Sequence, residues 1–110
     1  MLALSGEAKV FVCQEAVDLR KGFEGLGAIV EKFFCAELTS GAYFAFLNRR
    51  RDRIKVLYWD GDGLVIWYKR LEKGTFSKTK SETPMMSRRE FFMLLEGIIP
   101  KRLQVRYNIS

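Results

Sequence analysis

Three short runs of apolar, β-branched and aromatic residues lie close together in the middle of this sequence, and they restrict the fold more than any other feature. The runs cover residues 42–48, 53–60 and 64–70, and their composition is typical of β-strands. Connections of a few residues suit hairpins, whereas a parallel pair needs a much longer crossover. The spacing therefore predicts an antiparallel β-meander over residues 42–70.

Strand and helix patterns also precede the predicted meander. The run Lys9–Cys13 is apolar and rich in β-branched or aromatic residues, which predicts a first strand. Asp18 can cap a helix, and apolar residues then recur at steps of three and four, so we expect a helix over residues 20–34. Its buried face is expected to contain Phe23, Leu26, Ile29, Val30, Phe33 and Phe34.

The C-terminal third of the chain contains a loop pattern followed by a helix pattern. The stretch Ser77–Met86 is polar, contains a proline and predicts an exposed loop. Ser87 and Glu90 form a capping box, which predicts a helix near residues 87–97, and residues 99–110 fit an edge strand or an ordered tail. The expected fold is a single α+β domain over residues 1–110, with an N-terminal strand, the meander and two packed helices.

Both faces of the predicted middle strand carry apolar side chains. Alternation places Ile54 and Val56 on one face, and Leu57 and Trp59 on the other. We expect the helix of residues 20–34 to cover one face. The second face is left for the C-terminal helix or for a partner chain, and a homodimer stays open.

The sequence contains no histidine, which removes the commonest general base and the commonest metal ligand. Its two cysteines, Cys13 and Cys35, are too few for a closed zinc site, and we expect buried thiols in a reducing cytoplasm. Asp60 and Asp62 alternate with glycines as a tight turn requires, so they predict a hairpin rather than a metal site. We expect no enzyme activity, no catalytic residues, no cofactor, no metal and no membrane association.

Positive charge is concentrated after residue 48. Residues 1–48 contain four Lys or Arg against six Asp or Glu, whereas residues 49–110 contain fifteen against seven. A local basic surface attracts polyanions, and the abundant polyanion in a cytoplasm is nucleic acid. The charge distribution therefore favours DNA as a partner.

The strongest candidate for contact with DNA is a hairpin that has four arginines in five residues, Arg49 to Arg53. The side chains of Arg49, Arg50 and Arg51 are expected to point into water, where guanidinium groups can form paired hydrogen bonds with phosphate oxygens. A merely solvated loop is the alternative interpretation. In a meander, the third strand ends at the same end of the sheet as the hairpin between the first two strands. We therefore expect Lys69, Arg70 and Lys73 to belong to the same basic patch.

Aromatic residues are frequent in the meander and allow two interpretations. Exposed rings in a sheet can stack on unpaired bases, but a small domain needs most of its large rings in the core. We favour core packing for the set Tyr43, Phe44, Phe46, Tyr58, Trp59, Trp67 and Tyr68.

Four blocks of sequence, in order, resemble one known family. They are DLRKGFEGL at residues 18–26, NRRRDRIKVLYWDGDG at 48–63, YKRLEKGTF at 68–76 and LLEGI at 94–98. The chain is similar here to the TnpB accessory proteins, or Orf2-like proteins, of the bacterial insertion sequence family sixty-six. The resemblance implies a role in transposition beside a transposase and a helix-turn-helix-like protein, and it carries over no catalytic residue.

The leading hypothesis is an accessory protein for transposition that binds DNA through a basic patch around residues 49–55. The alternative is an adaptor that joins the transposase to another protein of the element without touching nucleic acid. The candidate nucleic-acid-binding residues are Arg20, Lys21, Arg49, Arg50, Arg51, Arg53, Lys55, Lys69, Arg70 and Lys73.

Overall fold

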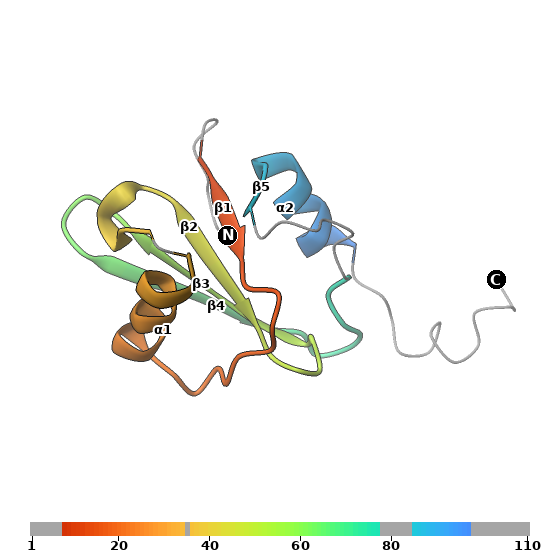
Figure 1. Cartoon of the computed structure of the whole chain (residues 1–110). Helices are drawn as coiled ribbons and strands as arrows, with labels where there is room; N and C mark the ends of the chain where they lie inside the picture. The colour runs from red at the N-terminus through yellow and green to blue at the C-terminus, as the bar shows by residue number, and fades with distance from the viewer. Residues whose placement is uncertain (1–7, 35, 78–84, 98–110) are drawn as a thin grey trace, which may run out of the picture.

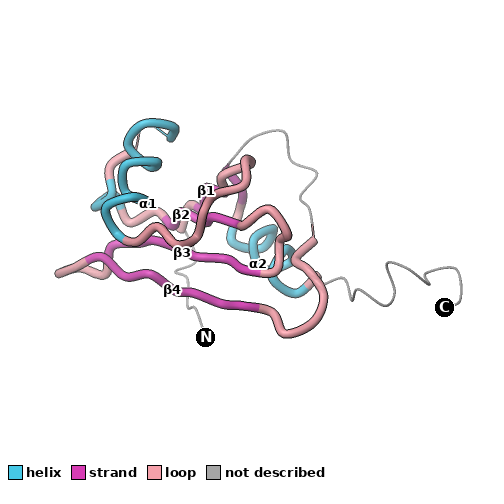
Figure 2. Tube along the Cα trace, turned by 90° about the horizontal axis from the view of Figure 1, so that it is seen from below, coloured by secondary structure: helices cyan, strands magenta, loops and turns pink. Residues whose placement is uncertain are grey.

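A five-stranded mixed sheet with two helices forms the domain in the computed structural model, which describes residues 8–34, 36–77 and 85–97 (Figure 1). The strand order is β4-β3-β2-β1-β5. Figures 1 and 2 place helix α1 and helix α2 at opposite ends of the sheet, with β4 at its edge. This arrangement confirms the expected α+β class.

The predicted meander is confirmed. It consists of β2 (Tyr43–Leu47), β3 (Arg53–Trp59) and β4 (Leu64–Arg70), each antiparallel to the next. Gly61 has a φ of 81° in the second turn, a conformation that glycine adopts without a steric penalty. The turn closes with a hydrogen bond of 2.8 Å from the Asp60 N–H to the Gly63 carbonyl.

The first strand, β1 (Val10–Val12), is also present, and it runs parallel to β2. Its other edge pairs in antiparallel fashion with β5 (Met85–Met86). The prediction of an exposed loop over residues 77–86 is therefore wrong at its end, because Met86 pairs with Val10 and is only 5% exposed. Residues 78–84, and the tail expected over 99–110, lie outside the described residues.

The first helix differs from its prediction at both ends. Helix α1 (Phe23–Ile29) begins three residues later than expected, and its cap position is Gly22 rather than Asp18. Val30–Phe34 then form a π-helical turn, and the short 3₁₀ helix Leu38–Ser40 follows. The wider turn adds one residue to each hydrogen-bonded ring, so the helical periodicity on which the prediction depended does not continue through residues 30–34.

Two side chains assigned to the buried face of this helix are instead exposed. Phe23 lies at the first helical position and is 50% exposed, and Phe33 lies in the π-helical turn and is 65% exposed. Leu26 and Val30 are fully buried, as predicted. The apolar periodicity therefore identified the helix but not every member of its buried face.

Each face of the sheet has its own apolar cluster, because successive side chains of a strand point to opposite faces. Phe44, Phe46 and Leu57 pack with Leu26 and Val30, on the side that α1 covers. The opposite cluster includes side chains of α2 (Arg88–Glu96) and comprises Val10, Val12, Ala45, Leu47, Ile54, Val56, Phe76, Met86, Phe91 and Leu94. Of the two partners left open for the second face, the C-terminal helix is the one that packs there.

The capping box predicted for the second helix is confirmed. The Ser87 hydroxyl accepts from the Glu90 N–H at 3.1 Å, and the Glu90 carboxylate accepts from the Ser87 N–H at 3.1 Å. These bonds satisfy two backbone donors that a helix start otherwise leaves unpaired. The start of α2 is thereby determined by residues that are close together in the sequence.

Two substitutions in α2 test how firmly this helix is packed. Phe91 is fully buried and Met93 is 62% exposed, although the two lie on the same helix. We expect Phe91→Ala to lower the free energy of unfolding by about 3–5 kcal/mol, and Met93→Ala by less than about 0.5 kcal/mol. Thermal or urea unfolding measures both values, and equal small losses would contradict the packing described.

Candidate nucleic-acid interface

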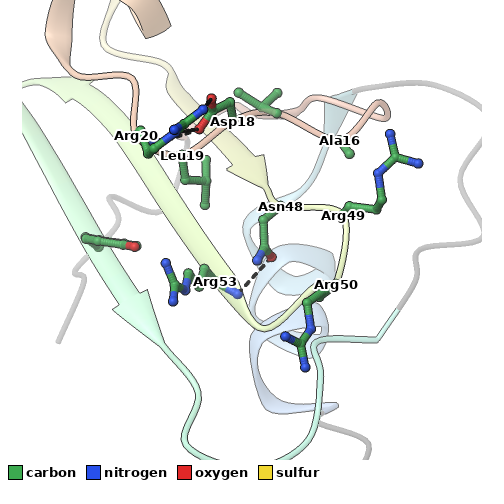
Figure 3. A pocket seen from close by; sticks show the side chains of 10 residues that line it. Ala16, Asp18, Leu19, Arg20, Asn48, Arg49, Arg50 and Arg53 are labelled. Carbon is green, nitrogen blue, oxygen red and sulfur yellow. Dashed lines mark hydrogen bonds and ion pairs between the residues drawn. The ribbon is translucent and has the colours of Figure 1, made fainter.

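A concave basic site lies where the loop before α1 approaches the β2–β3 hairpin, and we call it the arginine pocket. Its volume is about 640 Å³. Figure 3 shows Asp18 and Arg20 on the loop, and Arg49 and Arg50 reaching in different directions from the hairpin turn. The pocket is lined by Ala16, Val17, Asp18, Leu19, Arg20, Asn48, Arg49, Arg50, Arg53 and Tyr68.

The loop that forms one wall is anchored by its apolar residues. Val17 and Leu19 are buried against the α1 side of the sheet, and the Val17 N–H donates to the Leu47 carbonyl at 2.9 Å. Polar and charged residues alternate with these two anchors and stay exposed. The alternation therefore presents Asp18 and Arg20 at the surface of the pocket.

Asp18 and Arg20 form an exposed ion pair. Arg20 Nη2 lies 2.7 Å from Asp18 Oδ2, Arg20 Nε lies 3.0 Å from Asp18 Oδ1, and the Arg20 N–H donates to the same Oδ1 at 3.0 Å. The hydrogen bonds from Arg20 hold the pKa of Asp18 well below its usual range and raise that of Arg20. Asp18 therefore orders this segment and offsets part of the charge of Arg20, and it does not cap the helix.

The other wall is a tight turn organised by Asn48. Its Oδ1 accepts from the backbone N–H of Asp52 at 3.1 Å and of Arg53 at 3.0 Å, and its Nδ2 donates to Asp52 Oδ1 at 2.6 Å. The bond from Asn48, with smaller contributions from Arg50 and Arg53, lowers the pKa of Asp52. Such side-chain bonds to the backbone are typical of asparagine in turns.

Arg51 does not point into water, which corrects the expectation for the hairpin arginines. Its Nε donates to the Phe76 carbonyl at 3.2 Å and its Nη2 to the Ser77 carbonyl at 2.6 Å. The residue is half-buried with a φ of 58°, and burial lowers its pKa. Arg51 thus holds residues 76 and 77 against the turn, whereas Arg49 and Arg50 are exposed.

An exposed ring lies at the margin of the same pocket. Tyr68 is the cross-strand partner of Lys55 and is 49% exposed. Lys55 Nζ lies 4.8 Å from the centroid of the ring and donates to the Lys21 carbonyl at 2.9 Å. The prediction of core packing holds for Phe44 and Phe46, which are fully buried, but it is wrong for Tyr68.

The sheet register places the candidate residues of β4 on both faces of the sheet. Lys69 is opposite Ile54, so its side chain belongs to the α2 face, away from the arginine pocket. Arg70 is opposite Arg53 and therefore shares the face of the arginine pocket, although it does not line the pocket, and its Nη2 lies 3.6 Å from Glu72 Oε1. Lys73 is exposed beyond the strand. The pocket therefore gathers Arg20, Arg49, Arg50 and Arg53, with Lys55 beside Tyr68, and the single patch that we expected is divided.

An apolar groove adjoins the arginine pocket and shares Ala16, Val17 and Asp18 with it. Its volume is about 360 Å³, and its lining includes Lys21, the exposed Phe33 and the half-buried thiol of Cys13, whose pKa is raised by burial. Cys35 lies outside the described residues. No signal in the sequence indicated this groove, because Phe33 fits the helical periodicity of a core residue.

The described residues contain neither a metal-binding cluster nor a membrane-spanning helix. No cluster of three or more Cys, Asp or Glu side chains within residues 8–34, 36–77 and 85–97 could hold a metal ion. None of the helices in these ranges has the length and apolar character needed to cross a membrane.

Residues 8–105 match the family described as IS66 Orf2 like protein. The chain is 35% identical over 100 residues to uncharacterized protein y4jC of Sinorhizobium fredii, a match that covers 89% of this chain and 86% of that protein. It is 29% identical over 100 residues to uncharacterized protein y4hO of the same organism, with 89% and 87% covered. No solved structure matches the chain. The chain belongs to the IS66 Orf2-like family, as its sequence blocks indicated.

The different roles of neighbouring arginines give a stability prediction. Arg51→Ala removes the donors to the carbonyls of residues 76 and 77, and we expect the free energy of unfolding to fall by about 1–3 kcal/mol. The control Arg49→Ala removes an exposed side chain and should change it by less than about 0.5 kcal/mol. Urea unfolding measures both, and an unchanged Arg51→Ala variant would show that these hydrogen bonds contribute nothing to stability.

Proposed function

We propose that this member of an insertion sequence family acts in transposition by binding DNA, with the arginine pocket as its phosphate-binding site. The protein acts on the DNA of its own element, in company with the transposase and a helix-turn-helix protein. Its contribution is binding and positioning rather than catalysis. Its role as an accessory protein of an insertion sequence follows from the family to which it belongs.

The observation that carries the proposal is that four arginines from two segments of the chain line one concave site. Arg20 comes from the loop before α1, whereas Arg49, Arg50 and Arg53 come from the β2–β3 hairpin. Among the described residues, the three hairpin arginines form no ion pair, so their charge is available to an anionic ligand. Guanidinium groups bind phosphate oxygens through paired, charge-assisted hydrogen bonds, which supports a nucleic-acid backbone as that ligand.

The adaptor hypothesis stays as a second candidate, but on a different surface. The second sheet face, which the sequence left open to a partner chain, is covered by α2. The apolar groove beside the arginine pocket, with Phe33 exposed at its margin, is now the observation that favours a protein contact. If the protein is an adaptor, Phe33→Glu should abolish capture of the transposase in a pull-down, while Arg49→Ala/Arg50→Ala leaves that capture intact.

Binding to DNA should weaken steeply as salt rises. If four to six phosphates are neutralised, the logarithm of the association constant for a duplex should fall with the logarithm of salt concentration with a slope of about −4 to −5. The double variant Arg49→Ala/Arg50→Ala should make this slope shallower by roughly 0.9 per lost contact, and should weaken binding to all sequences alike. Fluorescence anisotropy at several salt concentrations measures both quantities.

The control for this experiment is Arg88→Ala/Arg89→Ala, which removes the same charge from exposed positions of α2. This variant should bind DNA as the unmodified protein does, apart from a small effect of net charge. Equal losses of DNA affinity in the two double variants would mean that only the overall charge of the protein matters. DNA binding that does not depend on salt would contradict the proposal.

The ion pair between Asp18 and Arg20 predicts a substitution that strengthens DNA binding rather than weakening it. Asp18→Asn removes a negative charge from the pocket and releases the Arg20 guanidinium, while an amide oxygen can still accept from the Arg20 N–H. We expect tighter DNA binding and a steeper salt slope, by up to about one unit. Anisotropy titration checks this, and weaker binding would show that Asp18 positions Arg20 for the ligand rather than withholding it.

A further inference from the structure

The arginine pocket has the composition of a nucleotide site as well as that of a phosphate patch. Its volume of about 640 Å³ lies within the range of about 300–1,000 Å³ that is usual for small-molecule pockets. A flat basic surface would serve a duplex backbone, but this site is concave and combines guanidinium groups with the ring of Tyr68. Phosphate and base are the two parts of a nucleotide that such groups recognise.

We propose that the arginine pocket accepts an unpaired nucleotide of single-stranded DNA, with its base stacked on Tyr68 and its phosphates held by the surrounding arginines. This inference rests on the proposed function and adds a strand preference to it. It gives the protein a role at unpaired or terminal stretches of the element's DNA, rather than along an intact duplex.

Tyr68 is suited to this role because its ring is both held and accessible. The strand pairing of β4 with β3 places it opposite Lys55, whose ammonium group lies over the ring at 4.8 Å from the centroid. Lys55 is itself fixed by the hydrogen bond to the Lys21 carbonyl. The ring is nevertheless 49% exposed, so it presents a prepared stacking surface beside the arginines.

Among the described residues, no other aromatic ring lines the arginine pocket. Tyr43 and Tyr58 pack against each other with centroids 4.8 Å apart, and both are partly buried. Phe23 and Phe33 are exposed but belong to the first helix and its π-helical turn, outside the arginine pocket. Tyr68 is the exposed ring that lines a site with four arginines.

The strand preference follows from the accessibility of a base face. In a duplex the faces of each base are covered by its neighbours, and a base must leave the stack before it can meet a protein ring. This step is unfavourable except for unpaired, mismatched or terminal bases. A ring at the margin of a concave site therefore contributes to binding of a single strand and not to binding of an intact duplex.

The test compares Tyr68→Leu, Tyr68→Phe and the control Phe33→Leu, which removes an exposed ring outside the pocket. Anisotropy titrations use a single-stranded DNA oligonucleotide, the matching duplex and an RNA of the same sequence. We expect Tyr68→Leu to weaken single-strand binding by about 5- to 100-fold, with duplex binding changed less than about twofold. Tyr68→Phe and Phe33→Leu should both bind the single strand nearly as well as the unmodified protein.

A second readout follows the base directly. A single strand containing 2-aminopurine should lose fluorescence when the analogue stacks on Tyr68, and this loss should disappear in Tyr68→Leu but persist in Tyr68→Phe. Circular dichroism melting of each variant shows whether it is folded. Tyr68→Phe keeps the ring in place, so it should keep both the affinity for the single strand and the loss of 2-aminopurine fluorescence. A fluorescence loss in the unmodified protein and in Tyr68→Phe supports the proposal even if Tyr68→Leu proves unstable, and the absence of that loss, or a large loss of affinity in Tyr68→Phe, would overturn it.

The outcomes separate this inference from the proposed function. If the unmodified protein binds DNA through Arg49 and Arg50, but Tyr68→Leu weakens single strand and duplex equally or neither, the nucleotide site is wrong and DNA binding stands. If the unmodified protein binds neither form of DNA, the proposed function fails first. Tighter binding to the RNA than to the DNA would overturn the assignment to single-stranded DNA.

Discussion

The hairpin turn between β2 and β3 is the structure on which the arginine pocket depends. Asn48 satisfies the backbone donors of Asp52 and Arg53, and Arg51 adopts a positive φ that closes the turn. The side chain of Arg51 is thereby directed to the carbonyls of Phe76 and Ser77. One arginine of the run therefore supports the fold, whereas its two predecessors, Arg49 and Arg50, are exposed.

Strand alternation distributes the remaining charges. Directly opposed residues of an antiparallel pair share a face, so Arg53 faces the same side as Arg70, and Lys55 the same side as Tyr68. Lys69, one residue along β4, belongs to the other side. A basic run in the sequence is thus divided between two surfaces, and the surface on the α1 side receives the ring, the hairpin arginines and the loop that carries Arg20.

The parts of the fold that local patterns determine could be predicted from the sequence. Short connections determined the pairing of the meander, and Ser87 with Glu90 determined the start of α2. Strand β5 has only two residues, so it carries no periodicity that could predict it. It is recognised as a strand only from its pairing with β1.

The candidate site shows the same division between local and distant causes. The basic residues and their common end of the sheet follow from composition and topology, whereas the inward position of Arg51 depends on carbonyls 25 and 26 residues away. The exposure of Tyr68 depends on what packs against the edge of the sheet, which no local pattern reports. The sequence nevertheless indicated a polar neighbour, since the short turn after β3 places this ring opposite Lys55.

DNA binding in the arginine pocket is tested most directly by titrating the isotopically labelled protein with a single-stranded DNA oligonucleotide and following the amide chemical shifts. If the arginine pocket binds DNA, the amide shifts should change in residues 16–20, 48–53 and around residue 68, and those of α2 should be unaffected. No change at saturating DNA, or changes confined to α2 or to the groove around Phe33, would contradict it.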